Sequence, residues 1–501
     1  MFRVKHLCVD TLSEHVIFIH EAAVRDGNLG FRPLDRVAVV GRHPEDGSTR
    51  EVIGVLNFCR DEIISPEEIG LSEDAFRDLG LPEGTQAQAT LSPAPQSVDL
   101  VRRKLEGGRL DRAGFEAILS DVVRRRYSKV ELSMFVLACA LRELDLEEVV
   151  DYTRAMIATG GHLDFGPGPV ADKHSIGGVP GNRTTMVVVP ILVALGVRVP
   201  KTSSRAITSP AGTADTMATL AEVALSPERL RGVVEETGGC IAWGGALSLA
   251  PADDILITVE RPMEIDTESQ MVASILAKKK TVGATHFLLD IPVGRSAKVH
   301  TIPAADHLAA LFRDVAQRID LRIDTVISEA RGPVGRGIGP RLEALDVLAV
   351  LSRAGDAPAD LREKSLYLAA RILEMTGAVE SPAGYREAQK ALDSGAAERA
   401  FRRIVQAQGE RALPPEAPFR ATVESAADGR IREIDCWEIA RVAKLAGAPA
   451  HPASGVRLLR AVGDVVAAGE PLLEIHAMSR AQIDFARDYA RTRTKMFRFG
   501  F

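Results

Sequence analysis

The feature that most limits what this chain can fold into is an alternation of short strand-like runs with longer helical segments between residues 164 and about 410. The strand-like runs are VRVPKTS, GCIAWG, DILITV, THFLLDIPV and IDTVISEA. Such alternation predicts an α/β layer with a parallel or mixed sheet, because helices commonly connect the strands of such a sheet. We therefore expect an α/β domain over residues 164–410.

Three further regions flank this domain. Residues 1–92 contain the strand-like runs VKHLCVD, HVIFIH, DRVAVVG and REVIGVLNF and predict a β-rich domain. Residues 97–163 show apolar residues three and four apart and predict a helical domain, to which a segment at about 264–284 returns. Residues 415–501 predict an α+β domain, whose run VGDVVAAGEPLLEIHA is similar to half of a biotinyl- or lipoyl-carrier domain but lacks a modifiable lysine at the hairpin tip. The predicted fold class is an α/β multidomain chain.

Composition excludes several functions. The net charge of −6 comes from interspersed acidic and basic residues, which argues against nucleic-acid binding through bulk positive charge. The five cysteines are scattered without a C-x-x-C pair, so we expect reduced thiols, a cytoplasmic location and no metal site. The longest apolar run, residues 186–197, is too short to cross a bilayer, and the charged start is unlike a signal peptide, so we expect no membrane partner.

The stretch DKHSIGGVPGNRTTM, residues 172–186, is the first candidate binding loop. Its glycines allow backbone N–H groups to point into one concavity, and the helix that follows presents its N-terminus to the same place. Hydrogen bonds to a charged group contribute about 1.5–3 kcal/mol each, so we expect Lys173, Ser175 and Thr185 to bind an anion. The alternative is a tight turn before a buried helix, with Lys173 solvated.

A second loop, KTSSRAITSPAGTADTMATL at residues 201–220, carries six Ser or Thr hydroxyls between Thr202 and Thr213, together with Arg205 and Gly212. A capping loop rich in Ser and Thr is the alternative interpretation. Two such loops predict two halves of one site or two phosphate groups. The segment GPVGRGIGP at residues 332–340 predicts either a mobile hinge or a simple connection.

The segment RPMEIDTESQMVASILAKKK, residues 261–280, offers a proton donor. Asp266 either caps the helix that follows it or acts as an acid with a raised pKa. His174 is the second candidate for a catalytic acid, unless it orients phosphate. The three lysines at 278–280 suit the C-terminus of that helix, and we expect this role for at least two of them.

The motifs DKHSIGG, SRAITSPAGTAD, ASILAKK and GRGIGPRLEAL, with the C-terminal region, resemble the thymidine/pyrimidine-nucleoside phosphorylase family over residues 97–490. The resemblance implies a fold of the nucleoside phosphorylase/phosphoribosyltransferase type, in which the helical and α/β domains form a cleft. Within the family, the N-terminal extension and SSRAITSPAGTAD are more similar to AMP phosphorylases. Pyrimidine enzymes carry a histidine at the position of Ser209 and a base-gripping arginine at that of Val259.

The resemblance also implies roles for particular residues. Phosphate would be bound by Lys173, Ser175, Thr185, Ser203 and Thr213. The nucleotide would be bound by Gly178, Ser204, Arg205, Ala206, Ile207, Thr208, Ser209, Thr213, Ser274 and Lys298. Asp266 would donate a proton, and Lys278 matches a lysine that contacts the base in pyrimidine enzymes.

The implied activity is phosphorolysis of a nucleoside monophosphate such as AMP, giving free base and ribose 1,5-bisphosphate. Inorganic phosphate is the co-substrate, no cofactor is expected, and the family implies a homodimer or a larger homo-oligomer. The first alternative is a thymidine or pyrimidine-nucleoside phosphorylase that gives a pentose 1-phosphate. The others are a Mg²⁺-dependent phosphoribosyltransferase similar to the anthranilate enzyme, and a non-catalytic nucleotide sensor or scaffold.

Overall fold

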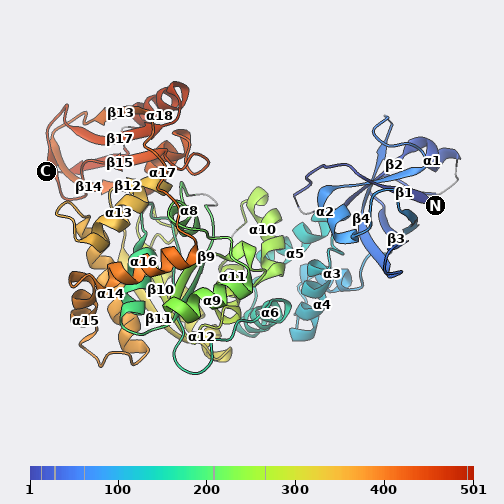
Figure 1. Cartoon of the computed structure of the whole chain (residues 1–501), viewed down its shortest axis with the longest axis horizontal. Coiled ribbons are helices and arrows are strands. Elements are labelled where there is room, and N and C mark those ends of the chain that lie inside the picture. The colour runs from blue at the N-terminus through green and yellow to red at the C-terminus, as the bar shows by residue number, and fades with distance from the viewer. Residues whose placement is uncertain are drawn as a thin grey trace. The chain divides into compact units, whose positions relative to one another are not determined.

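The computed structural model describes residues 1–12, 14–26, 30–60, 62–206, 209–265, 267–493 and 495–500. The chain forms two compact units, and each is described by itself. Unit 1 combines Met1–Gly160 with Ala250–Ala277, and unit 2 combines Gly161–Leu249 with Lys278–Phe501. Figure 1 colours the chain from its N-terminus in blue to its C-terminus in red.

Unit 1 begins with a closed β-barrel. Its strands are β1 (Phe2–His6), β2 (Val16–His20), β3 (Arg36–Arg42), β4 (Thr49–Cys59), β5 (Glu68–Leu71) and β6 (Gln86–Leu91), accompanied by α1 (Glu21–Asp26) and α2 (Glu73–Leu79). They pair in the order β1-β5-β2-β4-β3-β6. Figure 1 labels β1 to β4 of this barrel. Ile17, Ile19, Val37 and Leu56 are fully buried in the barrel core. Closure pairs both edges of every strand, which removes the aggregation risk of an open sheet.

The rest of unit 1 is helical. It contains α3 (Ser97–Leu105), α4 (Arg112–Val123), α5 (Lys129–Leu141) and α6 (Leu146–Thr159), with α10 (Pro251–Met263) and the first part of α11 (Glu268–Thr281). Side-chain caps begin several of these helices: Asp111 accepts the Gly114 N–H, and Ser128 forms a reciprocal capping box with Glu131.

The run DILITV was predicted to be a strand, and that prediction is wrong because it lies inside α10. Pro251 occupies the first turn, two aspartates follow it, and Ile255, Leu256 and Val259 are buried at helical spacing. α10 packs on α4, α5 and α6. The return to the helical domain therefore begins at residue 250 and not near 264.

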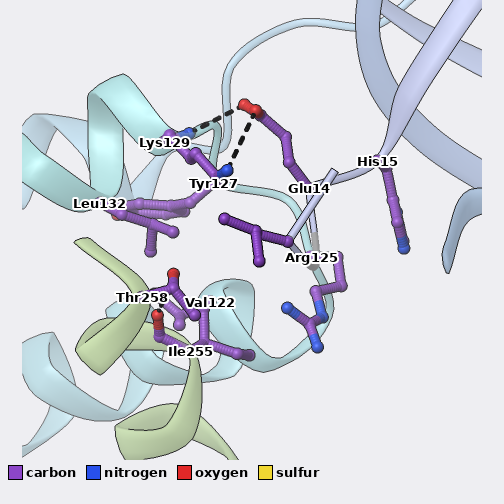
Figure 2. Close-up of a pocket in the computed structure, with 10 residues that line it drawn as sticks. Glu14, His15, Val122, Arg125, Tyr127, Lys129, Leu132, Ile255 and Thr258 are labelled. Carbon is purple, nitrogen blue, oxygen red and sulfur yellow. Dashed lines mark hydrogen bonds and ion pairs between the residues drawn. The ribbon is translucent and has the colours of Figure 1, made fainter. Parts of the chain in front are cut away.

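The barrel is docked on the start of α5 (Figure 2). Glu14 accepts the backbone N–H of Lys129 at 3.2 Å, as Figure 2 shows. Arg36 of β3 pairs with Glu131, and the Lys129 ammonium donates to the Thr11 carbonyl at 3.0 Å. An open pocket lies at this junction. It is lined by Leu12, Glu14, His15, Val122, Arg125, Tyr127, Lys129, Leu132, Ile255 and Thr258.

Unit 2 is built on parallel strands. β7 (Ala171–Ser175), β10 (His286–Val293) and β11 (Arg322–Glu329) pair in the order β11-β10-β7, and β8 (Val199–Ser203) pairs with β9 (Gly239–Trp243). A parallel bridge between Val170 and Arg198 connects the two sets. Because all pairings are parallel, the carboxyl ends of the strands meet at one edge.

The helices of this layer are α7 (Thr184–Ala194), α8 (Thr213–Ala218), α9 (Pro227–Thr237), α12 (Ile302–Arg318), α13 (Pro340–Ser352), α14 (Ala359–Met375), α15 (Gly384–Asp393) and α16 (Ala396–Gln408), with a short 3₁₀ turn at Gly244–Ala246. α7 is buried on all sides from Thr184 to Val193 and packs on α14 and α16. A helix that is apolar all round belongs at the centre of a domain. Its first residues, which follow the first predicted loop, are therefore rigidly held.

The C-terminal part of unit 2 is α+β. It contains β12 (Gly337–Ile338), β13 (Phe419–Glu424), β14 (Gly429–Ile434), β15 (Gly455–Leu458), β16 (Val465–Val466), β17 (Pro471–Ala477), β18 (Phe497–Gly500), α17 (Cys436–Leu445) and α18 (Arg480–Thr492). β12 joins the sheet order β12-β15-β17-β13. Ser296 accepts the Cys436 N–H at 3.0 Å, which ties this part to the α/β layer. Among the described residues, no helix has the length and apolar character needed to span a bilayer.

Candidate active site

Both predicted loops follow strands at the carboxyl edge of the parallel layer. β7 ends at Ser175, and residues 176–183 connect it to α7. β8 ends at Ser203, and residues 204–212 connect it to α8. β7 and β8 are neighbours, so the two loops lie side by side at the edge where open α/β sheets bind ligands.

β7 presents different chemistry on its two faces. Successive side chains of a strand point to opposite faces, so Asp172 and His174 share one face while Lys173 and Ser175 share the other. The two residues predicted to bind phosphate from this strand therefore point the same way. His174 points away from them.

On the first face, Asp172 is shared by two lysines. Its Oδ1 atom lies 2.8 Å from the ammonium of Lys201, and its Oδ2 atom lies 2.8 Å from that of Lys279. All three side chains are almost fully buried. Burial raises the pKa of Asp172, but the two lysines outweigh it and the net shift is downward. Burial lowers the pKa of Lys279 to about 7, so this group carries surplus positive charge only below that pH.

The second face repeats the arrangement around Asp290 of β10. The Lys364 ammonium lies 3.0 Å from Asp290 Oδ2, and the Lys173 ammonium lies 3.9 Å from the same atom. Burial raises the pKa of Asp290, yet the lysines lower it overall. Burial also lowers the pKa of Lys173 to about 8, because Asp290 offsets only part of the cost of burying its charge. A buried group with a surplus positive charge is suited to an anion.

Lys173 is held among hydroxyl and amide groups of the first loop. Its ammonium donates to Thr184 Oγ1 at 2.8 Å, and Asn182 accepts from Thr184 at 3.3 Å and donates to Ser175 Oγ at 3.4 Å. Lys173 is only 3% exposed, so the alternative of a solvated lysine is wrong. Thr185, the predicted ligand, is buried next to Thr184.

Gly178 and Lys298, both predicted to bind nucleotide, come together in the structure. Gly178 has φ +82°, and a Cβ atom there would lie 2.3 Å from the backbone nitrogen of Lys298. Glycine is therefore required by conformation and by contact. The Lys298 side chain is exposed at this edge of the layer.

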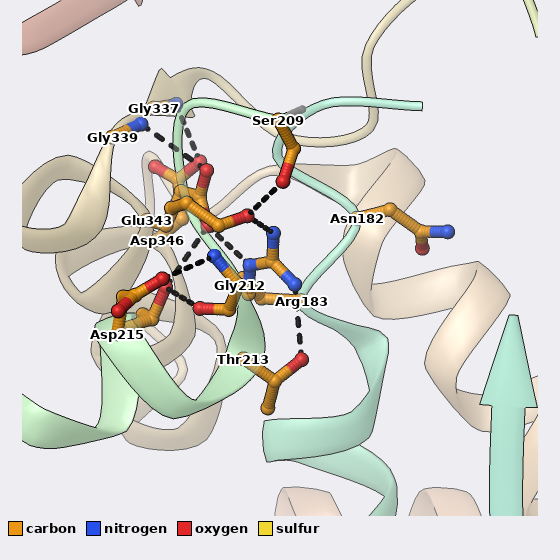
Figure 3. Close-up of polar contacts among 12 residues, drawn as sticks. Asn182, Arg183, Ser209, Gly212, Thr213, Asp215, Gly337, Gly339, Glu343 and Asp346 are labelled. Atoms are coloured by element: carbon orange, nitrogen blue, oxygen red, sulfur yellow. Dashed lines mark hydrogen bonds and ion pairs between the residues drawn. The ribbon is translucent and has the colours of Figure 1, made fainter. Parts of the chain in front are cut away.

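The second loop is closed by Asp215 of α8. This carboxylate accepts the N–H groups of Ala206 at 2.6 Å and Gly212 at 2.9 Å, and Ser209 Oγ donates to the Ala211 carbonyl at 2.9 Å. Figure 3 shows the loop residues gathered around Arg183. Ile207 and Thr208, two further predicted nucleotide ligands, lie outside the described residues.

Arg205 of the second loop is an available cation. Its guanidinium lies 4.9 Å from the centre of the Trp243 ring and 3.7 Å from Asp215, and its side chain is half-exposed. Ser203 is partly buried and Ser204 is exposed beside it. Trp243 ends β9, so the indole is fixed by the sheet while the guanidinium remains open to a ligand.

The segment at residues 332–340 is an anchored connection and not a free hinge. Asp346 accepts the N–H groups of Arg336 at 2.6 Å and Gly337 at 2.7 Å, and Glu343 accepts that of Gly339 at 3.1 Å. Burial raises the pKa of Asp346 to about 6. These carboxylates hold the segment in place (Figure 3), and its Val334 N–H donates to the Pro180 carbonyl of the first loop at 3.2 Å.

His174 does not suit the role of proton donor. Burial, helped by Lys279, Lys201 and Lys173, holds the pKa of His174 well below its usual range. The imidazole is therefore neutral at pH 7 and can orient a neighbour by hydrogen bonding, but it carries no extra proton to give.

The remaining predicted residues belong to unit 1. Asp266 lies outside the described residues, so its role as proton donor or helix cap stays a prediction. Ser274 lies on α11 and is partly buried, and Val259 is buried on α10.

Sequence reasoning missed several groups at the carboxyl edge: Asp172, Lys201, Lys279, Asp290, Lys364, Asn182, Arg183, Thr184, Trp243 and Glu343. Lys279 is the clearest case, since it pairs with buried Asp172 and does not serve as a solvated charge at a helix end. The available signal was the helical face of Lys279, since Leu276 and Val282, three residues to either side, are apolar. Asp290 stands alone in the apolar run FLLDIPV, where an unpaired charge would be costly.

Among the described residues, one group has the composition of a metal site. His6, Cys8 and Glu73 belong to the barrel of unit 1, and their ligand atoms lie within 4.8 Å of one another. His6 Nε2 already hydrogen-bonds Glu73 at 2.8 Å, and His6 Nδ1 lies 3.7 Å from the Cys8 sulfur. None of these three residues belongs to the two predicted loops.

Known proteins match this chain along most of its length. Residues 98–160 match the "Glycosyl transferase family, helical bundle domain", residues 167–398 the "Glycosyl transferase family, a/b domain", and residues 430–496 the "Pyrimidine nucleoside phosphorylase C-terminal domain". A Polaromonas protein named "Putative thymidine phosphorylase" is 46% identical, covering 98% of this chain and 95% of the relative. A Methylococcus capsulatus protein of the same name is also 46% identical, with the same coverage.

A solved structure shares the fold. Anthranilate phosphoribosyltransferase from Thermus thermophilus superposes with a TM-score of 0.53 at 20% identity, covering 62% of this chain and 99% of that chain. The chain therefore belongs to the thymidine/pyrimidine-nucleoside phosphorylase family, and it is a pentosyltransferase.

Proposed function

We propose that this enzyme cleaves the N-glycosidic bond of a nucleoside monophosphate such as AMP by phosphorolysis. The products are the free base and ribose 1,5-bisphosphate. The observation that carries the proposal is the half-exposed guanidinium of Arg205, held over Trp243 on the second loop. It supplies a cationic position on the second loop in addition to the buried lysines, as a substrate with its own 5′-phosphate requires.

Inorganic phosphate is the nucleophile in this proposal. Lys173 and the hydroxyls of Ser175, Thr185, Ser203 and Thr213 hold it. The bond from C1′ to the base nitrogen breaks, a bond from C1′ to a phosphate oxygen forms, and the base leaves with a proton. The charge of the held phosphate stabilises the positive charge that develops on the ribose, and holding it in place lowers the entropic cost. Asp266 is the proposed proton donor, on the strength of the motif resemblance.

The substrate's own phosphate would lie against Arg205 and the hydroxyls around it. A hydrogen bond to an ionised group is roughly twice as strong as a neutral one, and a guanidinium presents two parallel N–H groups to a phosphate. The Arg205 guanidinium lies 3.7 Å from Asp215, which is beyond hydrogen-bond distance, so this contact leaves its N–H donors available to a ligand.

Val259 supports the same choice. Pyrimidine-nucleoside enzymes of the family grip the base with an arginine at the corresponding position. Here the position is apolar, and its side chain is 4% exposed. A buried valine supplies no hydrogen bond to a pyrimidine.

The second candidate is a thymidine or pyrimidine-nucleoside phosphorylase that gives pentose 1-phosphate. It is favoured by the names of the full-length relatives in Polaromonas and Methylococcus capsulatus. The two candidates share the phosphate site and differ in whether the substrate carries a 5′-phosphate.

Steady-state rates with AMP, CMP, UMP, adenosine and thymidine, each with and without inorganic phosphate, separate the candidates. We expect a monophosphate to be fastest, with a bisphosphorylated sugar detected by ³¹P NMR. Faster turnover of thymidine than of any monophosphate would reject the proposal. We also propose that no cofactor or metal takes part, so activity should persist in excess chelator, which a Mg²⁺-dependent phosphoribosyltransferase would not tolerate.

A further inference from the structure

We propose that Arg183 is a positioning residue for phosphate: it joins the two loops and turns the hydroxyl of Thr213 toward the anion. The inference rests on the proposed function for the identity of the anion. Neither the resemblance nor the loop motifs assigned Arg183 a role.

Three hydrogen bonds fix the guanidinium of Arg183. Its Nε atom donates to Glu343, one terminal nitrogen donates to Thr213 Oγ1 at 2.9 Å, and the other donates to the Ala211 carbonyl at 2.7 Å. Arg183 ends the first loop, and Ala211 and Thr213 lie at the end of the second. The side chain is therefore a direct link between the two loops (Figure 3).

The link determines what Thr213 can offer. A threonine hydroxyl has one donor and two acceptor positions, whereas an arginine can only donate. Thr213 Oγ1 accepts from Arg183, so its own O–H must point elsewhere. Among the described residues the structure gives that O–H no acceptor. An anion between the loops would supply one.

Arg183 itself is not positioned as a counter-ion. Its charge is balanced by Glu343, which is 1% exposed and also accepts from Thr216 at 3.0 Å and from the Gly339 N–H at 3.1 Å. Each of its three nitrogens donates to a protein acceptor, which uses three of its five N–H groups and holds the guanidinium in place. It therefore acts through Thr213.

A double-mutant cycle on the full chain tests this. The variants are Arg183→Lys, Thr213→Val and the double variant, and the readout is the Kd for inorganic phosphate by calorimetry, with KM values for phosphate and for AMP. Lysine keeps the charge and loses the fork. We expect each single variant to weaken phosphate binding about tenfold, the loss of one charge-assisted hydrogen bond. We expect the double variant to bind no more weakly than Thr213→Val, because coupled residues act on one contact.

Two controls sharpen the result. Thr213→Ser keeps the hydroxyl, so its Kd for phosphate should stay within about twofold of the parent's. Arg371→Lys is the control for an arginine change elsewhere, because Arg371 pairs with Asp324 away from both loops. Multiplicative losses in the double variant, or an unchanged Kd in Arg183→Lys, would overturn the proposal. If Arg183→Lys does not fold, an unchanged Kd in Thr213→Val overturns it alone. The Kd needs no nucleotide, so failure to turn over AMP would reject the proposed function without touching this test.

Discussion

The Lys279 ammonium lies 2.8 Å from Asp172 Oδ2, with both side chains almost fully buried and Lys201 bound to the other carboxylate oxygen. Two buried lysines therefore share one carboxylate. The negative charge of Asp172 offsets the free-energy cost of burying both lysines. Replacing Asp172 should therefore affect stability more than replacing either lysine.

Asp172→Asn should therefore destabilise the protein strongly. Removing one partner of a buried ion pair costs about 3–5 kcal/mol, since the remaining charge is left uncompensated. The loss should be larger below pH 7 than above it, because burial already lowers the pKa of Lys279 to about 7 and the lysine sheds its proton more readily without Asp172. Thermal and denaturant unfolding measure both effects. Asp324→Asn is the control: it breaks a part-exposed pair with Arg371 and should cost at most about 1 kcal/mol.

Phosphate affinity should fall as the pH rises through about 8. Burial lowers the pKa of Lys173 to that value, so above it the lysine loses the charge that attracts the anion. Calorimetry from pH 6.5 to 9.5 gives the profile. Lys173→Met should bind phosphate weakly at every pH and show no step near 8; a step of equal size in that variant would refute the assignment.

The lowered pKa of Lys173 affects the stability of the phosphate-free protein in the opposite direction: the free energy of unfolding increases with pH where phosphate affinity decreases. The folded pKa of Lys173 lies below the ordinary value of about 10.4, so between the two values the unfolded chain binds more protons. The contribution of Lys173 to the free energy of unfolding should thus rise with pH from about 8. Thermal unfolding without phosphate, compared between the parent and Lys173→Met, isolates this contribution.

Arg205→Gln should discriminate between nucleotides and nucleosides. If Arg205 binds a 5′-phosphate, KM for AMP should rise about tenfold or more while KM for adenosine or thymidine changes little. Trp243→Leu should give a smaller change in the same direction, since it removes the ring that holds the guanidinium. Equal effects on nucleotide and nucleoside would contradict the role.

The family resemblance predicts a homodimer or larger assembly, and α5 offers a surface for it. Val130, Met134, Leu137 and Leu141 recur every three or four residues on one side of the helix, and Val130 and Leu141 are largely exposed. Replacing Val130 and Leu141 by aspartate should reduce the mass measured by light scattering. Val465→Asp, at an exposed valine of β16, should leave it unchanged.

The sequence predicted the order of elements well because their signals are local. The caps Ser128 and Glu131 and the apolar run of α7 mark their helices within a few residues. DILITV was misassigned because β-branched residues favour strands, while burial of every third or fourth residue against α4–α6 decides the outcome.

The candidate site was predicted in part for a related reason. Lys173 and Thr213 lie in recognisable motifs, but Asp290 and Lys364 meet Lys173 only because β10 and α14 pack beside β7. Arg183 was indistinguishable from an ordinary surface arginine until Glu343, 160 positions later, was placed against it. Pairings between distant residues depend on tertiary packing, which motifs do not encode.

Successive side chains of β7 point to opposite faces of the sheet, and this constrains the number of residues in the strand. A single inserted or deleted residue before Lys173 would slip the register, turning the lysine toward Asp172's partners and the imidazole toward Asp290. The strand could still pair and the layer could still fold, yet the ammonium would face the wrong way. Ala171–Ser175 should therefore be unable to change length even where its individual apolar contacts tolerate substitution.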